Sequence, residues 1–80
     1  MKARVTVTLK TSVLDPQGKA IEGSLKSLGF DGVESVRQGK VFDLEIEGTD
    51  EAKAEADIKA MCEKLLANTV IEAYRVEIAG

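Results

Sequence analysis

The chain has 80 residues, 44% of them hydrophobic, with 11 basic and 14 acidic side chains for a net charge of −3. This length allows one domain, spanning residues 1–80, and excludes a second. The basic residues are not clustered and only 4% of the residues are aromatic, which argues against nucleic acid as a partner, because such binding relies on counterion release and base stacking. No apolar stretch approaches the length of a membrane span or resembles the apolar segment of a signal peptide, so we expect a cytoplasmic protein without a membrane partner.

Residues 3–10 alternate between apolar and polar side chains, which predicts a half-buried strand. A helix follows, and its start is marked by Asp15 and Pro16. A residue before proline avoids the helical conformation and can cap a helix with its side-chain oxygen, while proline fits the first helical position. We therefore predict a helix from Pro16 to about Leu28, with Gly29 just after its end, where glycine is favoured.

The middle of the chain is expected to form two short strands joined by a hairpin. The first strand is placed around residues 33–38 and the second around residues 41–47, where apolar and acidic side chains alternate. The turn between them is placed at Gln38 and Gly39. Gly39 is expected to adopt a positive φ there, which glycine accepts without steric cost.

A second helix and a last strand complete the chain. Thr49 or Asp50 is expected to cap this helix, since acidic side chains suit the positive end of a helix dipole. Its apolar stripe has helical spacing and consists of Ala54, Ile58, Met61, Cys62 and Leu65. The helix is expected to end near residues 67–68, and residues 70–78 alternate again, which predicts the last strand.

The predicted order of elements is βαββαβ, which is typical of an α+β fold with two layers, a ferredoxin-like antiparallel sheet and two helices on one of its faces. A domain of this size with a thin aliphatic core is marginally stable alone. We therefore expect the chain to dimerise through the sheet, giving a homodimer or a tetramer. The sheet face without helices is the one expected to be covered by another subunit, and it is expected to carry Thr6, Thr8, Val41, Ala73 and Arg75.

Residues that carry out chemistry are scarce. The chain has no histidine, which removes the usual nucleophile–base pairs and the commonest metal ligand. Cys62 cannot form a metal site alone and lies on an apolar helix stripe, so we interpret it as a core residue. Residues 18–24 lack the lysine that a phosphate-binding loop needs before its final serine. We predict no catalytic, cofactor-binding or metal-binding residue in this chain.

Three segments taken together resemble a known family. They are residues 14–21 (LDPQGKAI), 36–40 (VRQGK) and 65–72 (LLANTVIE). With the leading strand, they resemble PurS, the small subunit of phosphoribosylformylglycinamidine (FGAM) synthase. The resemblance covers essentially the whole chain in length and in the order of its elements.

The resemblance implies an adaptor subunit of an ATP- and glutamine-dependent ligase. In this family the small subunit joins a large synthetase subunit and a glutaminase subunit, which make FGAM in de novo purine biosynthesis. The small subunit is expected to bridge the other two and to support ammonia transfer. ATP and Mg²⁺ are used by the large subunit, and no cofactor is expected on this one. We predict that the partner interface includes Lys10, Asp15, Pro16, Gln17, Gly18, Arg37, Gln38, Lys40, Asn68 and Glu72.

An alternative function follows from the fold alone. Small βαββαβ domains often dimerise and bind a ligand between subunits, so a dimeric ligand-binding regulatory module is the second hypothesis. A ligand that binds the native state raises its thermal stability by mass action. A metabolite alone should therefore stabilise such a module, whereas an adaptor should respond to its partner proteins.

Overall fold

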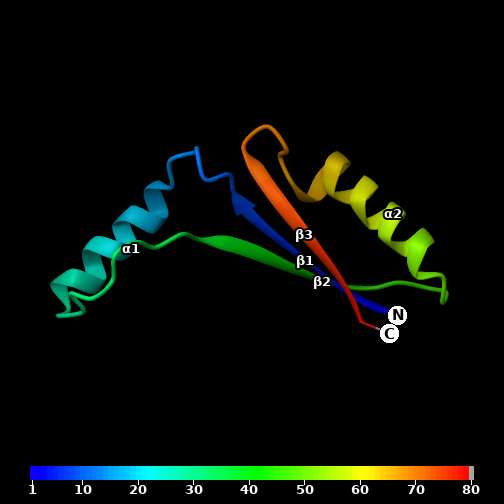
Figure 1. Cartoon of the computed structure of the whole chain (residues 1–80), viewed down its shortest axis with the longest axis horizontal. Helices are drawn as coiled ribbons and strands as arrows, with labels where there is room; N and C mark the ends of the chain where they lie inside the picture. The colour runs from blue at the N-terminus through cyan, green and yellow to red at the C-terminus, as the bar shows by residue number, and fades with distance from the viewer. Residues whose placement is uncertain (80) are drawn as a thin grey trace.

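A computed structural model describes residues 1–79, and over these residues it contains a sheet of three strands and two helices (Figure 1). The order of elements is β1 (Lys2–Leu9), α1 (Pro16–Ser27), β2 (Gly39–Glu45), α2 (Glu51–Met61), a π-helical turn η1 (Cys62–Leu66) and β3 (Glu72–Ala79). The predicted α+β class, with an antiparallel sheet and two helices, is confirmed.

Strand β1 lies at the centre of the sheet, between β2 and β3, and it pairs antiparallel with both. Val5 stands opposite Phe42 on β2 and Val76 on β3. The alternation predicted for the first strand is confirmed, because Ala3, Val5 and Val7 are buried on one face. That face is the one that contacts α2.

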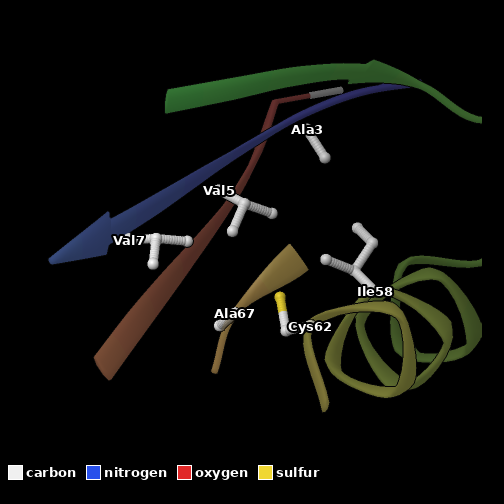
Figure 2. Close-up of a cluster of buried hydrophobic side chains, with 6 residues drawn as sticks. All are labelled: Ala3, Val5, Val7, Ile58, Cys62 and Ala67. Atoms are coloured by element: carbon white, nitrogen blue, oxygen red, sulfur yellow. The ribbon is translucent and has the colours of Figure 1, made fainter. Parts of the chain in front are cut away.

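The core lies between this face and α2 (Figure 2). Ile58 and Cys62 are fully buried there and face Val5 and Val7 of β1. The predicted core role of Cys62 is thus confirmed. Phe42, Leu44, Ile46, Tyr74, Val76 and Ile78 surround the core and are only half-buried. The sheet face is therefore incompletely covered within one chain.

Helix α2 is capped as predicted, since the Asp50 carboxylate accepts a hydrogen bond from the Lys53 amide at 3.1 Å. Its predicted apolar stripe is only partly correct. Met61 is 40% exposed and Leu65 is 83% exposed. For Leu65 the cause is the π turn that follows α2, in which the Ala67 amide donates to the Cys62 carbonyl. A π turn has more residues than an α turn, so Leu65 rotates away from the sheet.

Helix α1 begins and ends as predicted, but its position differs from the expectation. Asp15 caps it, Pro16 occupies its first position, and Gly29 follows it with a φ of 97°. The expectation that both helices cover one face of the sheet is wrong. Instead, α1 projects beyond the end of the sheet, far from α2 (Figure 1). The Cα radius of gyration is 16.0 Å, whereas a compact domain of this length has about 12 Å.

The strand predicted at residues 33–38 is also absent from the described structure. This segment returns from α1 toward the sheet without joining a ladder (Figure 1). Its polar backbone groups face α1 instead, because the Gln38 amide donates to Asp15 and the Val36 carbonyl lies against Gly18. No hairpin forms, and Gly39 starts β2 without a positive φ.

Candidate functional site

All of the residues predicted to contact partners lie at one end of the sheet. The antiparallel topology explains this, because β1 ends where β2 and β3 begin, and Leu9 pairs with Glu72. Lys10 follows β1, Lys40 is the second residue of β2, and Asn68 precedes β3. Pro16, Gln17 and Gly18 form the first turn of α1. We call this end of the molecule, formed by residues 10–18, 36–40 and 68–72, the junction.

Asp15 lies at the centre of the junction and is buried, with 5% of its surface exposed. One carboxylate oxygen accepts from the Gly18 amide and the other from the Gln38 amide, each at 2.8 Å. The hydrogen bond from Gln38, followed by that from Gly18, lowers the pKa of this carboxyl, and burial opposes the shift. Asp15 is therefore both the cap of α1 and a link to the start of β2.

Arg37 makes a second link across the junction. Its guanidinium Nη2 donates to the Lys10 carbonyl at 2.9 Å and to the Val13 carbonyl at 3.0 Å. The planar guanidinium places its donors in a fixed geometry, so one side chain orders the whole loop between β1 and α1. Arg37 was predicted as a partner-interface residue, and in the structure its Nη2 donates to the backbone of its own chain.

Glu72 organises the third part of the junction. One of its carboxylate oxygens accepts from the Asn68 amide at 2.7 Å, and the other lies 3.7 Å from the Lys40 ammonium. The Lys10 amide also donates to the Ile71 carbonyl at 2.8 Å. The turn before β3 is thus fastened to both β1 and β2.

A shallow cleft of about 240 Å³ opens between these segments. Its lining is mainly polar and includes much of the predicted interface. The lining residues are Val7, Leu9, Asp15, Gln17, Gln38, Gly39, Lys40 and Glu72. The Asp15 and Glu72 carboxylates in this cleft already accept hydrogen bonds from backbone amides of the same chain. The cleft therefore offers a shaped surface and not free reactive groups.

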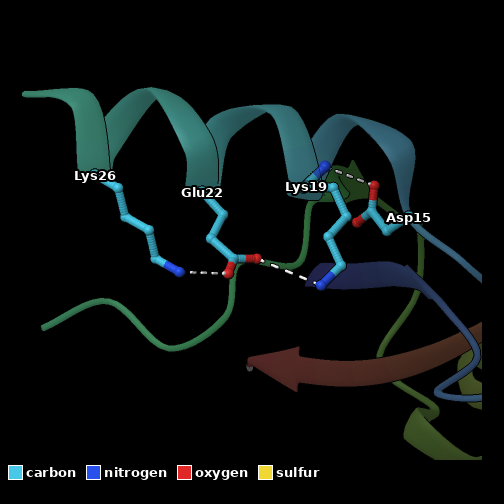
Figure 3. Close-up of polar contacts among 5 residues, drawn as sticks. Asp15, Lys19, Glu22 and Lys26 are labelled. Carbon is cyan, nitrogen blue, oxygen red and sulfur yellow. Dashed lines mark hydrogen bonds and ion pairs between the residues drawn. The ribbon is translucent and has the colours of Figure 1, made fainter. Parts of the chain in front are cut away.

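One further polar cluster on α1 was not selected from the sequence. Glu22 lies 3.2 Å from the Lys26 ammonium and 3.6 Å from that of Lys19, along one side of the helix (Figure 3). The hydrogen bond from Lys26 lowers the Glu22 pKa, and burial opposes the shift. The spacing of four residues between Glu22 and Lys26 is the signal that identifies such a pair in a sequence.

Three further features bear on metal binding, thiol reactivity and membrane contact. Over residues 1–79 no group of three or more Cys, Asp or Glu side chains is arranged to hold a metal ion. Burial raises the pKa of the Cys62 thiol, which opposes formation of the reactive thiolate. No helix in this range is long and apolar enough to cross a membrane.

Comparison with known proteins identifies the family. Residues 2–80 match the family model for PurS, described as phosphoribosylformylglycinamidine (FGAM) synthase. The chain belongs to the PurS family. It is 53% identical to the FGAM synthase subunit PurS of Synechocystis over 96% of this chain and 77% of that protein. It is 52% identical to the corresponding Bacillus subtilis subunit, over 96% of this chain and 90% of that protein.

Solved PurS structures share the architecture of this chain. The Bacillus subtilis PurS structure in its C2 crystal form gives a TM-score of 0.90 at 51% identity, covering 99% of this chain and 98% of that one. A chain in the structure of PurLQS from Thermotoga maritima gives a TM-score of 0.87 at 37% identity, covering 95% of this chain and 93% of that one. The elongated arrangement, with α1 beyond the sheet, is therefore consistent with the PurS fold.

Proposed function

We propose that this chain is the non-catalytic adaptor subunit of a cytoplasmic FGAM synthase in purine biosynthesis. The observation that carries the proposal is the near full-length match to proteins named as the PurS subunit of that enzyme. One structural relative belongs to a PurLQS complex. As a PurS family member, the chain joins a synthetase subunit, which uses ATP and Mg²⁺, and a glutaminase subunit.

The proposed role is to hold two active sites in fixed relative positions while ammonia passes between them. Such a role needs a rigid body and exclusion of water, by the same logic as positioning within an active site. The junction offers rigidity, because the Asp15, Arg37 and Glu72 side chains cross-link segments that are far apart in the sequence. We therefore keep the junction as the proposed partner interface.

We also propose that the chain functions as a homodimer through its sheet. On the α2 face, Phe42, Leu44 and Ile46 are only half-buried, and α1 of the same chain does not cover them. Helix α1 and its C-cap also carry exposed apolar residues, Ile21 within the helix and Leu28 at the cap. In a dimer, α1 of one copy would cover the open part of the sheet of the other, which removes both apolar surfaces from water.

The test of the adaptor role is a reconstitution with the cognate synthetase and glutaminase subunits. Product is assayed from formylglycinamide ribonucleotide and ATP, with either glutamine or ammonia as the nitrogen source. We expect glutamine-dependent synthesis to require this chain, and ammonia-dependent synthesis to require it less. Full glutamine-dependent activity of the two large subunits alone would reject the adaptor role. Stabilisation of this chain by a metabolite alone would favour the regulatory module.

A further inference from the structure

The α1 lobe, defined as residues 16–35, is joined to the sheet by two segments of chain, residues 10–15 on the outgoing side and residues 36–38 on the returning side. One leaves β1 and reaches α1, and the other returns from α1 to β2 (Figure 1). The molecule measures 49 × 26 × 14 Å along its principal axes, and the lobe occupies one end of the longest. Since packing against the sheet does not fix the position of the lobe, these two segments must do so.

The two segments hold each other reciprocally. Asp15, on the outgoing segment, accepts a hydrogen bond from the backbone amide of Gln38 on the returning one. Arg37, on the returning segment, donates to the carbonyls of Lys10 and Val13 on the outgoing one. Each segment therefore supplies one side chain that binds the backbone of the other. In each of these hydrogen bonds one partner is a charged side chain, and such charge-assisted bonds are the stronger class of hydrogen bond.

A close backbone contact restricts the same place. Gly18, in the first turn of α1, is buried and lies directly against the Val36 carbonyl. A side chain at this position would overlap that carbonyl and the Asp15 carboxylate. Helix α1 and the returning segment are thus in contact at the point where Asp15 links them.

We propose that Asp15 and Arg37 form a clasp that sets the orientation of the α1 lobe and keeps it away from the sheet of its own chain. The effect of this clasp on dimerisation rests on the homodimer proposed above. A lobe folded back would cover the open part of its own sheet, and a lobe held out can cover that of a second copy. Exchange of an identical element in this way is a known route to dimers, and hinge segments control it.

Asp15→Asn separates the clasp from the helix cap. Asparagine caps helices as well as aspartate does, so its oxygen can still accept from Gly18. Its amide group, however, presents N–H donors to the Gln38 N–H and cannot accept from it. Arg37→Gln removes the other half of the clasp and tests the proposal independently. The matched control for Asp15→Asn is Asp50→Asn, because Asp50 caps α2 by accepting from the Lys53 amide alone. The matched control for Arg37→Gln is Arg4→Gln, which loses only an exposed ion pair with Asp43.

The orientation is measured directly with spin labels on Ser24→Cys in α1 and Asp57→Cys in α2, which are both exposed positions. Labelled chains are diluted tenfold with unlabelled chains, so that only distances within one chain are detected. We expect one narrow distance distribution for the parent protein and the controls. Either clasp variant should broaden it at least twofold or add a shorter distance, and should weaken dimerisation about tenfold in sedimentation experiments.

The outcomes separate the clasp from the dimer. An unchanged distance distribution in both clasp variants would overturn the clasp, whatever the oligomeric state. A parent protein that stays monomeric would reject the proposed dimer, while broadening in the variants would still establish the clasp. Broadening in the Asp50→Asn control would also count against the proposal, since it would show that the distance responds to a change of cap residue that leaves the link to Gln38 intact.

Discussion

Lys40 and Glu72 lie on the two edge strands of the sheet, yet their charged groups are 3.7 Å apart across the end of the central strand. The contact is possible because Lys40 pairs with Val7 and Glu72 pairs with Leu9 near the end of β1, which places the two charged side chains on the same face of the sheet. The same glutamate accepts from the Asn68 amide at 2.7 Å. Glu72 therefore fastens the turn before β3 to the opposite edge of the sheet.

Glu72→Ala should release this turn. The ion pair with Lys40 contributes little on its own because the lysine is exposed, but the Asn68 amide loses a charged acceptor. We expect the free energy of unfolding to fall by about 1 kcal/mol, and hydrogen exchange at the Asn68 amide to become faster. The matched control is Glu77→Ala, which loses an exposed pair with Arg75. Equal exchange rates at Asn68 in both variants would show that Glu72 does not order the turn.

The stability of the protein should depend on pH through Asp15. Its pKa is lowered in the folded state, mainly by the hydrogen bond from Gln38. Its contribution to stability is therefore fully present above its ordinary pKa of 3.8, and it is lost as the pH falls through the lower folded-state value. In urea unfolding, the parent protein should be more stable than Asp15→Asn at pH 7, and the difference should shrink below pH 4. A difference that stays constant with pH would contradict the assignment.

Gly18 and Gly23 lie in the same helix and should respond oppositely to alanine. A Cβ on Gly18 would overlap the Val36 carbonyl, whereas a Cβ on Gly23 meets nothing within 4 Å. Gly18→Ala should destabilise the protein by about 1 to 3 kcal/mol, as overpacking does. Gly23→Ala should stabilise it by up to about 1 kcal/mol, because alanine favours a helix. The free energy of unfolding of the two variants is measured by chemical denaturation. If both alanines stabilise the protein, the segment that carries the Val36 carbonyl must move aside at little cost.

Local signals in the sequence predicted the elements well, but not their arrangement. Asp15 and Asp50 cap their helices as expected, since capping depends on residues a few positions away. The position of α1 was missed because the Asp15–Gln38 link joins residues 23 positions apart. The strand predicted at residues 33–38 is absent because the Gln38 amide and the Val36 carbonyl face Asp15 and Gly18, at the start of α1, instead of joining a ladder. The predicted interface residues share one end of the sheet, which followed from the antiparallel order and not from any local pattern.

Cys62 should react slowly in the native protein. Its side chain is fully buried against β1, and burial raises the pKa of its thiol. A thiol reagent at pH 8 should therefore modify it at a rate limited by opening of the structure, and the rate should rise with urea in step with unfolding. Cys62→Ser should destabilise the protein by about 1 to 3 kcal/mol, because a polar hydroxyl replaces the thiol at a fully buried, apolar position. Fast modification without denaturant would contradict the core position.

The final prediction concerns which surface forms the proposed dimer. If α1 of one copy covers the open sheet face of another, Ile21→Asp places a charge in the interface and should weaken dimerisation about thirtyfold or more, as for a central apolar contact. Val41 lies on the opposite sheet face, where it is 55% exposed. Val41→Asp should leave the dimer intact under this arrangement. Sedimentation equilibrium of the two variants separates the cases, since a dimer lost only in Val41→Asp would place the interface on the face expected from the sequence.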